Sequence, residues 1–298
     1  MQPARRTIAT AQNFTIGIVE LVSDASDKPL LVCLPGGSYT AEYFDVAEHS
    51  LLRRAAAHGF DVVALDRPNY GASDALAPDA TTFARNAEII DDAIAQLWAQ
   101  RGCPYPGVVL IGHSIGGAVA IHLAAQRSRG WPLLGISISG ISELSPAPVV
   151  DAWRAIPPGA PVDFTNEQRR AYMYGPDGSF APEVIEHAAI AAAPIPLAEL
   201  HEIIGGWLED IPHLGPRVAV PVQYALPEFD QLWVVSPERV EAFANRFANA
   251  PMVDAILARG VGHNLDHHAD SDTWHARQLA FAQECVLAAA TSHTTSTP

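Results

Sequence analysis

Hydrophobic and polar positions follow two periodicities in the first half of the chain. Residues 13–22 (NFTIGIVELV) alternate apolar and polar side chains, as a half-exposed strand does. Short apolar runs typical of buried strands occupy residues 30–34, 62–65, 108–111 and 133–139. Helical patterns lie between these runs, at residues 41–58, at 82–100 and from 118 onward. This alternation predicts an α/β fold with a mostly parallel sheet and helices on both faces.

The alternation stops between residues 142 and 216, where no strand pattern is visible. Three helices are expected there: Thr165 and Gln168 form a capping box, and Pro182 and Pro196 each suit a first helical position. An all-helical insertion in an α/β chain is expected to cover one edge of the sheet. The strand pattern then resumes at 218–226 and 253–258, with helices from 236 and over 272–290. We therefore predict a core domain of residues 1–141 and 217–298 with a helical cap of residues 142–216.

Composition narrows the possible functions. Hydrophobic residues make up 49% of the 298 residues and charged residues 17%, which is enough apolar material for a sizeable core. A net charge of −15 disfavours nucleic acid and anionic membranes as partners. No secretory signal and no membrane-spanning run is visible, and Cys33, Cys103 and Cys285 are too widely spaced for a disulfide framework. We expect a cytoplasmic monomer or homodimer that acts on a small-molecule substrate without a cofactor.

The motif Gly112-His113-Ser114-Ile115-Gly116 directly follows the apolar run at 108–111. A nucleophilic serine needs this context, because small neighbours permit a sharp turn and the next helix points its N-terminus at the reaction centre. An ordinary turn with a solvated serine is the alternative. However, Asp230 and His263 follow the two later strands, and carboxyl ends of parallel strands share one edge of a sheet. We expect these side chains to meet Ser114 and to supply its acid and base.

The order serine, acid, histidine resembles that of the α/β-hydrolase family, as does LDRPNYGAS at residues 65–73. The resemblance implies an α/β-hydrolase fold and acyl transfer by Ser114, His263 and Asp230. Glu143 and Glu228 are the alternative acids. Backbone N–H groups of Ile115 and Gly37 are the expected oxyanion donors, with Ser38 as a rival, in a Pro-Gly-Gly loop where many relatives carry His-Gly.

The expected activity is carboxylesterase or thioesterase. A hydrolase that cleaves C–C or amide bonds with the same three residues, or a binding protein without turnover, is the alternative. A serine nucleophile argues against the family's dehalogenases and epoxide hydrolases. Substrate contacts are expected from Ser38, Tyr39, His113, Tyr172, Met173 and Trp207.

Large cap side chains such as Trp153 and Phe164 could roof an apolar pocket for a neutral acyl group of small to moderate size. An anionic substrate would require Arg154, Arg169 or Arg170 to face inward. His113 is expected to pack or hydrogen-bond rather than to catalyse.

The segment HNLDHHADSDTWH, residues 263–275, collects histidines and aspartates. A dinuclear metal site would need further ligands from other loops, and no histidine pair with ligand spacing occurs elsewhere in the sequence. We therefore assign no metal, and we expect a solvated approach to the last helix.

Overall fold

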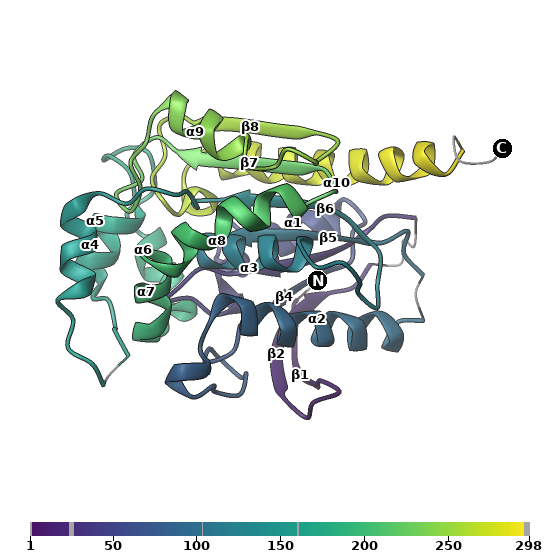
Figure 1. Ribbon diagram of the computed structural model, residues 1–298, viewed down its shortest axis with the longest axis horizontal. Coiled ribbons are helices and arrows are strands. Elements are labelled where there is room, and N and C mark those ends of the chain that lie inside the picture. The colour runs from purple at the N-terminus through teal and green to yellow at the C-terminus, as the bar shows by residue number, and fades with distance from the viewer. Residues whose placement is uncertain (1, 24–26, 103, 160, 295–298) are drawn as a thin grey trace.

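The computed structural model describes residues 2–23, 27–102, 104–159 and 161–294, so Cys103 lies outside the described part of the chain. Eight strands form a single sheet in the order β1-β2-β4-β3-β5-β6-β7-β8 (Figure 1). β1 pairs antiparallel with β2 and β2 with β4, while every other neighbouring pair is parallel. The strands are β1 Ala4–Ala9, β2 Thr15–Leu21, β3 Leu30–Leu34, β4 Val62–Leu65, β5 Val108–His113, β6 Leu133–Ser139, β7 Val222–Pro227 and β8 Val253–Ala258.

Helices cover both faces of this sheet. The core helices are α1 Leu51–Ala57, α2 Phe83–Gln100, α3 Ile115–Ala124, α9 Pro237–Ala244 and α10 Ser271–Thr294. Helices α2, α3 and α9 bury their apolar side chains on one face, and α1 and α10 bury theirs on the other. Strands β3 and β5 are buried along their whole length because both faces are covered, which explains their continuous apolar sequences. The predicted mostly parallel sheet with helices on both faces is confirmed.

The segment 142–216, which we call the cap, connects β6 to β7 and groups its helices α4–α7 at one end of the sheet (Figure 1). Its helices are α4 Ala147–Arg154, α5 Asn166–Met173, α6 Val184–His187, α7 Leu197–Ile203 and α8 Gly206–Leu214. Single bridges join Tyr39 to Ala192 and Val162 to Ile195, so this segment also contains extended backbone. No helix in the described part of the chain combines the length and the apolarity needed to cross a membrane.

Several helices and strands differ from those that the sequence pattern predicts. The expected helix from Pro196 is two helices, because the backbone of Gly205 leaves the helical region between α7 and α8. The helix expected from Pro182 amounts to one short turn, α6, followed by a 3₁₀ turn at Ala188–Ala191. Helix α4 and strand β1 were not predicted. β1 is an edge strand in which only Ile8 is buried, so its sequence carries no apolar alternation.

Candidate active site

Ser114 lies at the junction between β5 and α3, in a backbone conformation that few residues other than glycine adopt. Its φ is 51° and its ψ is −123°, and its N–H donates to the Ser139 carbonyl at 2.8 Å. A Cβ on Gly116 would come within 2.0 Å of the Leu34 carbonyl oxygen, and one on Gly112 within 2.6 Å of the Gly116 oxygen. The two glycines of the motif are therefore required by close backbone packing, and the sharp turn lifts Ser114 out of the sheet.

His263 and Asp230 come from the loops that follow β8 and β7. His263 Nδ1 lies 2.7 Å from Asp230 Oδ2, and both side chains are almost completely buried. The second carboxylate oxygen of Asp230 accepts the Leu232 N–H at 2.9 Å, which fixes the carboxylate. A carboxylate on Nδ1 selects the imidazole tautomer in which Nε2 carries the free lone pair. The contact with Asp230 therefore leaves Nε2 as the nitrogen of His263 that is free to accept a proton.

The other two candidate acids lie elsewhere. Glu143 forms an ion pair with Arg246 at 2.8 Å. Glu228 binds Arg259 at 2.7 Å and accepts the Gly260 N–H at 2.9 Å. Asp230 is therefore the carboxylate that the structure places on His263.

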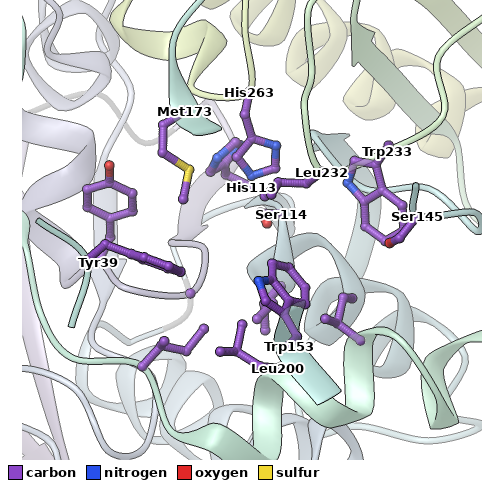
Figure 2. Close-up of a pocket in the computed structure, with 15 residues that line it drawn as sticks. Tyr39, His113, Ser114, Ser145, Trp153, Met173, Leu200, Leu232, Trp233 and His263 are labelled. Carbon is purple, nitrogen blue, oxygen red and sulfur yellow. The ribbon is translucent and has the colours of Figure 1, made fainter. Parts of the chain in front are cut away.

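Ser114 and His263 line the same pocket under the cap, together with Gly37 and Ile115. Figure 2 shows Ser114 between His263 on one side and Trp153 with Leu200 on the other. The apolar part of the wall includes Trp153, Phe164, Leu200, Ile203, Leu232 and Trp233. The pocket is narrow, with a cavity volume of about 30 Å³.

The loop of residues 35–38, which is expected from the sequence to supply an oxyanion donor and is called the oxyanion loop below, passes directly beside Ser114. A Cβ on Gly36 would lie 2.9 Å from the Ser114 Cβ, and one on Gly37 would lie 2.9 Å from the Ile115 Cδ1. Among the described residues, the Gly37 N–H has no acceptor in the chain. Ser38, in contrast, is fully buried and does not line the pocket. Of the two rival donors, Gly37 is the one in the pocket with a free N–H.

The expected substrate contacts divide into two groups. Tyr39, His113 and Met173 line the pocket. Ser38 does not: it is fully buried, and its Oγ accepts a hydrogen bond from Arg169 at 3.0 Å. Trp207 is also fully buried, and its indole N–H donates to the Ser142 carbonyl at 2.8 Å, which makes it part of the cap core.

Tyr172 is half-buried against Phe164, with ring centroids 6.1 Å apart, and it lies outside the pocket lining. The wall residues Leu232 and Trp233 were missed. The available signal is the apolar pair that begins two residues after Asp230, in the loop that follows β7.

His113 packs beside the site rather than toward solvent. Its ring stacks on Tyr43 at 4.8 Å with an interplanar angle of 7°, and it lies 4.8 Å from the His263 ring. Burial lowers the pKa of His113 well below its usual value, so the ring is neutral. A neutral, stacked ring supports the expectation of a packing role.

The histidine-rich segment is buried, and the expectation of a solvated approach to α10 is wrong. Asp266 binds Tyr43 and His275, at 2.9 Å and 3.0 Å. His268 accepts the N–H groups of Gly175 and Gly262 at Nε2 and donates from Nδ1 to the Asn264 carbonyl. Burial is possible because these polar atoms have partners within the protein. Among the described residues, no group of three potential ligands is arranged to hold a metal ion.

The fold and the arrangement of the pocket residues indicate the class of protein to which the chain belongs. The chain belongs to the α/β-hydrolase family, whose model matches residues 31–279.

Similar proteins include esterases. The chain is 27% identical over 139 residues to protein phosphatase methylesterase 1 of Pongo abelii, a match that covers 47% of this chain and 34% of that protein. The chain thus spans about a third of the curated relatives it matches. A thermophilic esterase from Thermogutta terrifontis superposes with a TM-score of 0.65 at 21% identity, covering 95% of this chain and 99% of that one. Epoxide hydrolase VrEH1 from Vigna radiata reaches a TM-score of 0.68 at 15% identity, covering 95% and 98%. The structural likenesses show the fold.

Proposed function

We propose that the protein is a serine hydrolase that cleaves carboxylic esters or thioesters by acyl transfer. The observation that carries this proposal is one pocket lined by Ser114 and by a His263 whose Nδ1 is hydrogen-bonded to the buried Asp230. A serine hydroxyl is a poor nucleophile at neutral pH unless a base is oriented toward it. The sharp turn at Ser114 and the free N–H of Gly37 supply the other parts that acyl transfer requires.

In the proposed reaction, Ser114 Oγ attacks the substrate carbonyl carbon while His263 Nε2 takes the hydroxyl proton. The π electron pair moves to the carbonyl oxygen, which receives hydrogen bonds from the N–H groups of Gly37 and Ile115. Collapse of this intermediate breaks the bond to the alcohol or thiol, and His263 returns the proton to that leaving group. Water then attacks the acyl-enzyme by the same route and releases the acid.

The pocket wall supports a neutral, apolar acyl group. Side chains from the cap and from the loop after Asp230 surround Ser114 with aliphatic and aromatic surface. Of the three arginines that could have faced an anionic substrate, Arg169 binds Ser38 and Arg170 binds Asp177, while Arg154 is exposed and does not line the pocket. The small free space favours short acyl chains.

A fluorophosphonate probe with intact-mass measurement tests this function. The wild-type protein is expected to gain one adduct, and Ser114→Ala none. Turnover of p-nitrophenyl esters with two to twelve acyl carbons is then expected to peak at the short end. A well-folded wild-type protein that gains no adduct and hydrolyses none of these esters would refute the proposal.

A further inference from the structure

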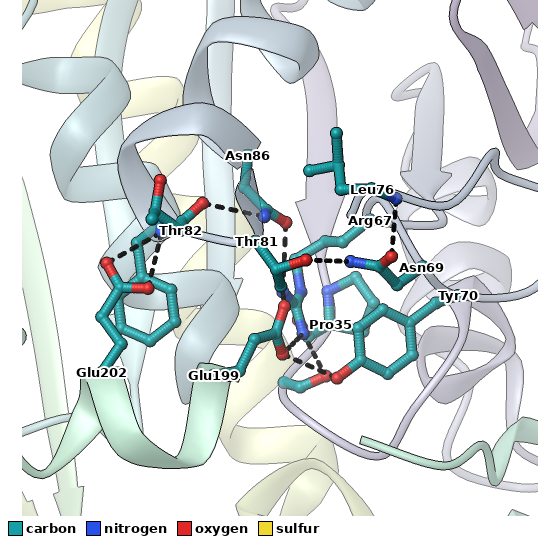
Figure 3. A network of polar contacts seen from close by, with 12 residues as sticks. Pro35, Arg67, Asn69, Tyr70, Leu76, Thr81, Thr82, Asn86, Glu199 and Glu202 are labelled. Atoms are coloured by element: carbon teal, nitrogen blue, oxygen red, sulfur yellow. Dashed lines mark hydrogen bonds and ion pairs between the residues drawn. The ribbon is translucent and has the colours of Figure 1, made fainter. Parts of the chain in front are cut away.

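Arg67, at the start of the loop after β4, is completely buried although it carries a charge. Its Nε donates to the Pro35 carbonyl at 2.9 Å, and one terminal nitrogen donates to the Gly36 carbonyl at 3.2 Å. The same guanidinium forms a two-pronged ion pair with Glu199, at 2.6 Å and 3.0 Å (Figure 3). Arg67 therefore connects the oxyanion loop to helix α7 of the cap.

The contact at Gly36 has a geometric consequence for Gly37. The Gly36 carbonyl and the Gly37 N–H belong to one peptide group, which is planar and trans, so the two point in opposite directions. Fixing the carbonyl on Arg67 therefore fixes the direction of the N–H. Gly37 lines the pocket beside Ser114, so the N–H held in this way belongs to the proposed oxyanion site.

The cap holds both ends of this loop. Glu199 is completely buried, and it also accepts the Tyr70 hydroxyl at 2.7 Å. At the other end, Arg169 of α5 donates to the Ser38 carbonyl at 3.3 Å, and that carbonyl also accepts the Ala193 N–H at 2.9 Å. The carbonyls of residues 35, 36 and 38 are thus all bound. A buried ion pair of this kind contributes little net stability, because desolvation offsets its attraction, so a geometric role is the better explanation.

We propose that Arg67 is a positioning residue that orients the Gly37 N–H toward the oxyanion. Its ion pair with Glu199 makes this orientation depend on the contact between the core and the cap. The proposal rests on the proposed acyl-transfer function. It implies that the oxyanion site is complete only while α7 is docked on the core.

The test compares Arg67→Lys with wild type on a short p-nitrophenyl ester. Lysine keeps the charge but lacks the planar fork that reaches two carbonyls and a carboxylate together. We expect kcat/KM to fall by about 10²–10³-fold, the effect of losing one oxyanion donor. The inhibition constant of a trifluoromethyl ketone, which forms a tetrahedral adduct on Ser114, should rise by a similar factor. The affinity of the matching ether, which develops no oxyanion, should stay unchanged.

Two further variants make the test specific. Glu199→Gln keeps the shape and a hydrogen-bond acceptor, so it should fold and lose about tenfold in kcat/KM, with the same contrast between ketone and ether. Arg101→Lys is the matched control, because Arg101 also forms largely buried ion pairs, with Glu20 and Asp61, but does so at the amino end of β4, away from the pocket. Its kcat/KM should equal that of wild type.

Unchanged ketone inhibition in folded Arg67→Lys or Glu199→Gln would overturn the proposal, as would an equal loss of ether affinity, which indicates a merely structural role. A wild-type protein without turnover or fluorophosphonate adduct would instead refute the proposed function itself.

Discussion

Two loops frame the pocket, and the side chains that link each loop to the cap form different kinds of hydrogen bond. The oxyanion loop is held by the charged side chains Arg67 and Arg169. The histidine loop, residues 259–268, is held by the neutral ring of His268, whose Nε2 accepts one N–H from the cap at Gly175 and one from Gly262, at 3.0 Å and 2.9 Å.

This difference predicts that the contacts of the two loops respond differently to acid. The pKa of Arg67 is raised further above its usual value, because Glu199 and Tyr70 outweigh the effect of burial. Burial lowers the pKa of His268 to about 4. An imidazole that gains a proton at Nε2 can no longer accept the two N–H groups. The contacts of the guanidinium groups with the loop carbonyls therefore persist in acid, whereas the contacts of the neutral His268 ring are lost.

The largest effect is expected from Asp230→Asn, which changes the hydrogen bond to His263 and leaves the contacts of the oxyanion loop intact. The side-chain amide would favour the imidazole tautomer with a proton on Nε2, which cannot act as a base. We expect kcat to fall by about 10³–10⁴-fold, more than for Arg67→Lys. Glu143→Gln, whose carboxylate binds Arg246, is the control and should change kcat by less than about threefold. The opposite ranking of the two variants would assign the acid to Glu143.

Gly116→Ala should produce the second largest effect, at the place where the turn at Ser114 packs against residues 34 and 35. The added Cβ would lie 2.0 Å from the Leu34 carbonyl oxygen and 2.6 Å from the Pro35 oxygen, and neither backbone group can move away freely. We expect a loss of about 3 kcal/mol or more in the free energy of unfolding, measured by urea denaturation. Gly130→Ala, where the new Cβ would meet only the Ala95 Cβ at 3.5 Å, should stay close to wild type. Equal stability of the two variants would show that the turn is not tightly packed.

Much of the site could be predicted because its parts follow strands. Ser114, Asp230 and His263 each come just after an apolar run, and the topology of parallel strands brings such positions to one edge. The roles of Arg67 and His268 could not be predicted in this way. Both side chains are buried by contacts with cap residues more than 90 positions away, Glu199 and Gly175, and no local period records such contacts. Composition alone placed the histidines in solvent, since polar residues are usually exposed.

The acid response can be isolated by comparing wild type with His268→Gln at pH 7 and pH 5. A folded pKa below the unfolded value means that His268 contributes stability that is complete above about pH 6.5 and is lost as the pH falls toward 4. The difference in unfolding free energy between the two proteins should therefore shrink by about 2 kcal/mol between pH 7 and pH 5. The corresponding difference for Arg67→Lys should stay constant over the same range. If the difference in unfolding free energy between wild type and His268→Gln does not change with pH, the predicted acid sensitivity of the histidine loop is wrong.

The smallest effect concerns Glu202, which lies beside the Arg67–Glu199 pair. Its ionisation at high pH is expected to lower the stability of the folded protein on this side of the pocket. Its carboxylate accepts the Phe83 N–H at the start of α2 at 2.9 Å (Figure 3). Burial, with a smaller contribution from Glu199, raises the pKa of Glu202 to about 7. The folded protein then holds a proton that the unfolded chain has released, so stability falls as the pH rises from about 4.5 to about 7.

Glu202→Gln removes this titration but keeps an oxygen that can accept the Phe83 N–H. Because the side chain is only half-buried, solvent screens the effect, and we expect the variant to be more stable than wild type by about 1 kcal/mol at pH 8. At pH 4.5 the two should be equal, and thermal unfolding at both values measures the difference. A variant that is less stable at pH 8 would mean that the carboxylate charge stabilises the N-terminus of α2 by more than its burial costs. In that case both sides of the pocket would weaken in acid, and the contrast between them would lie only in the chemistry of their contacts.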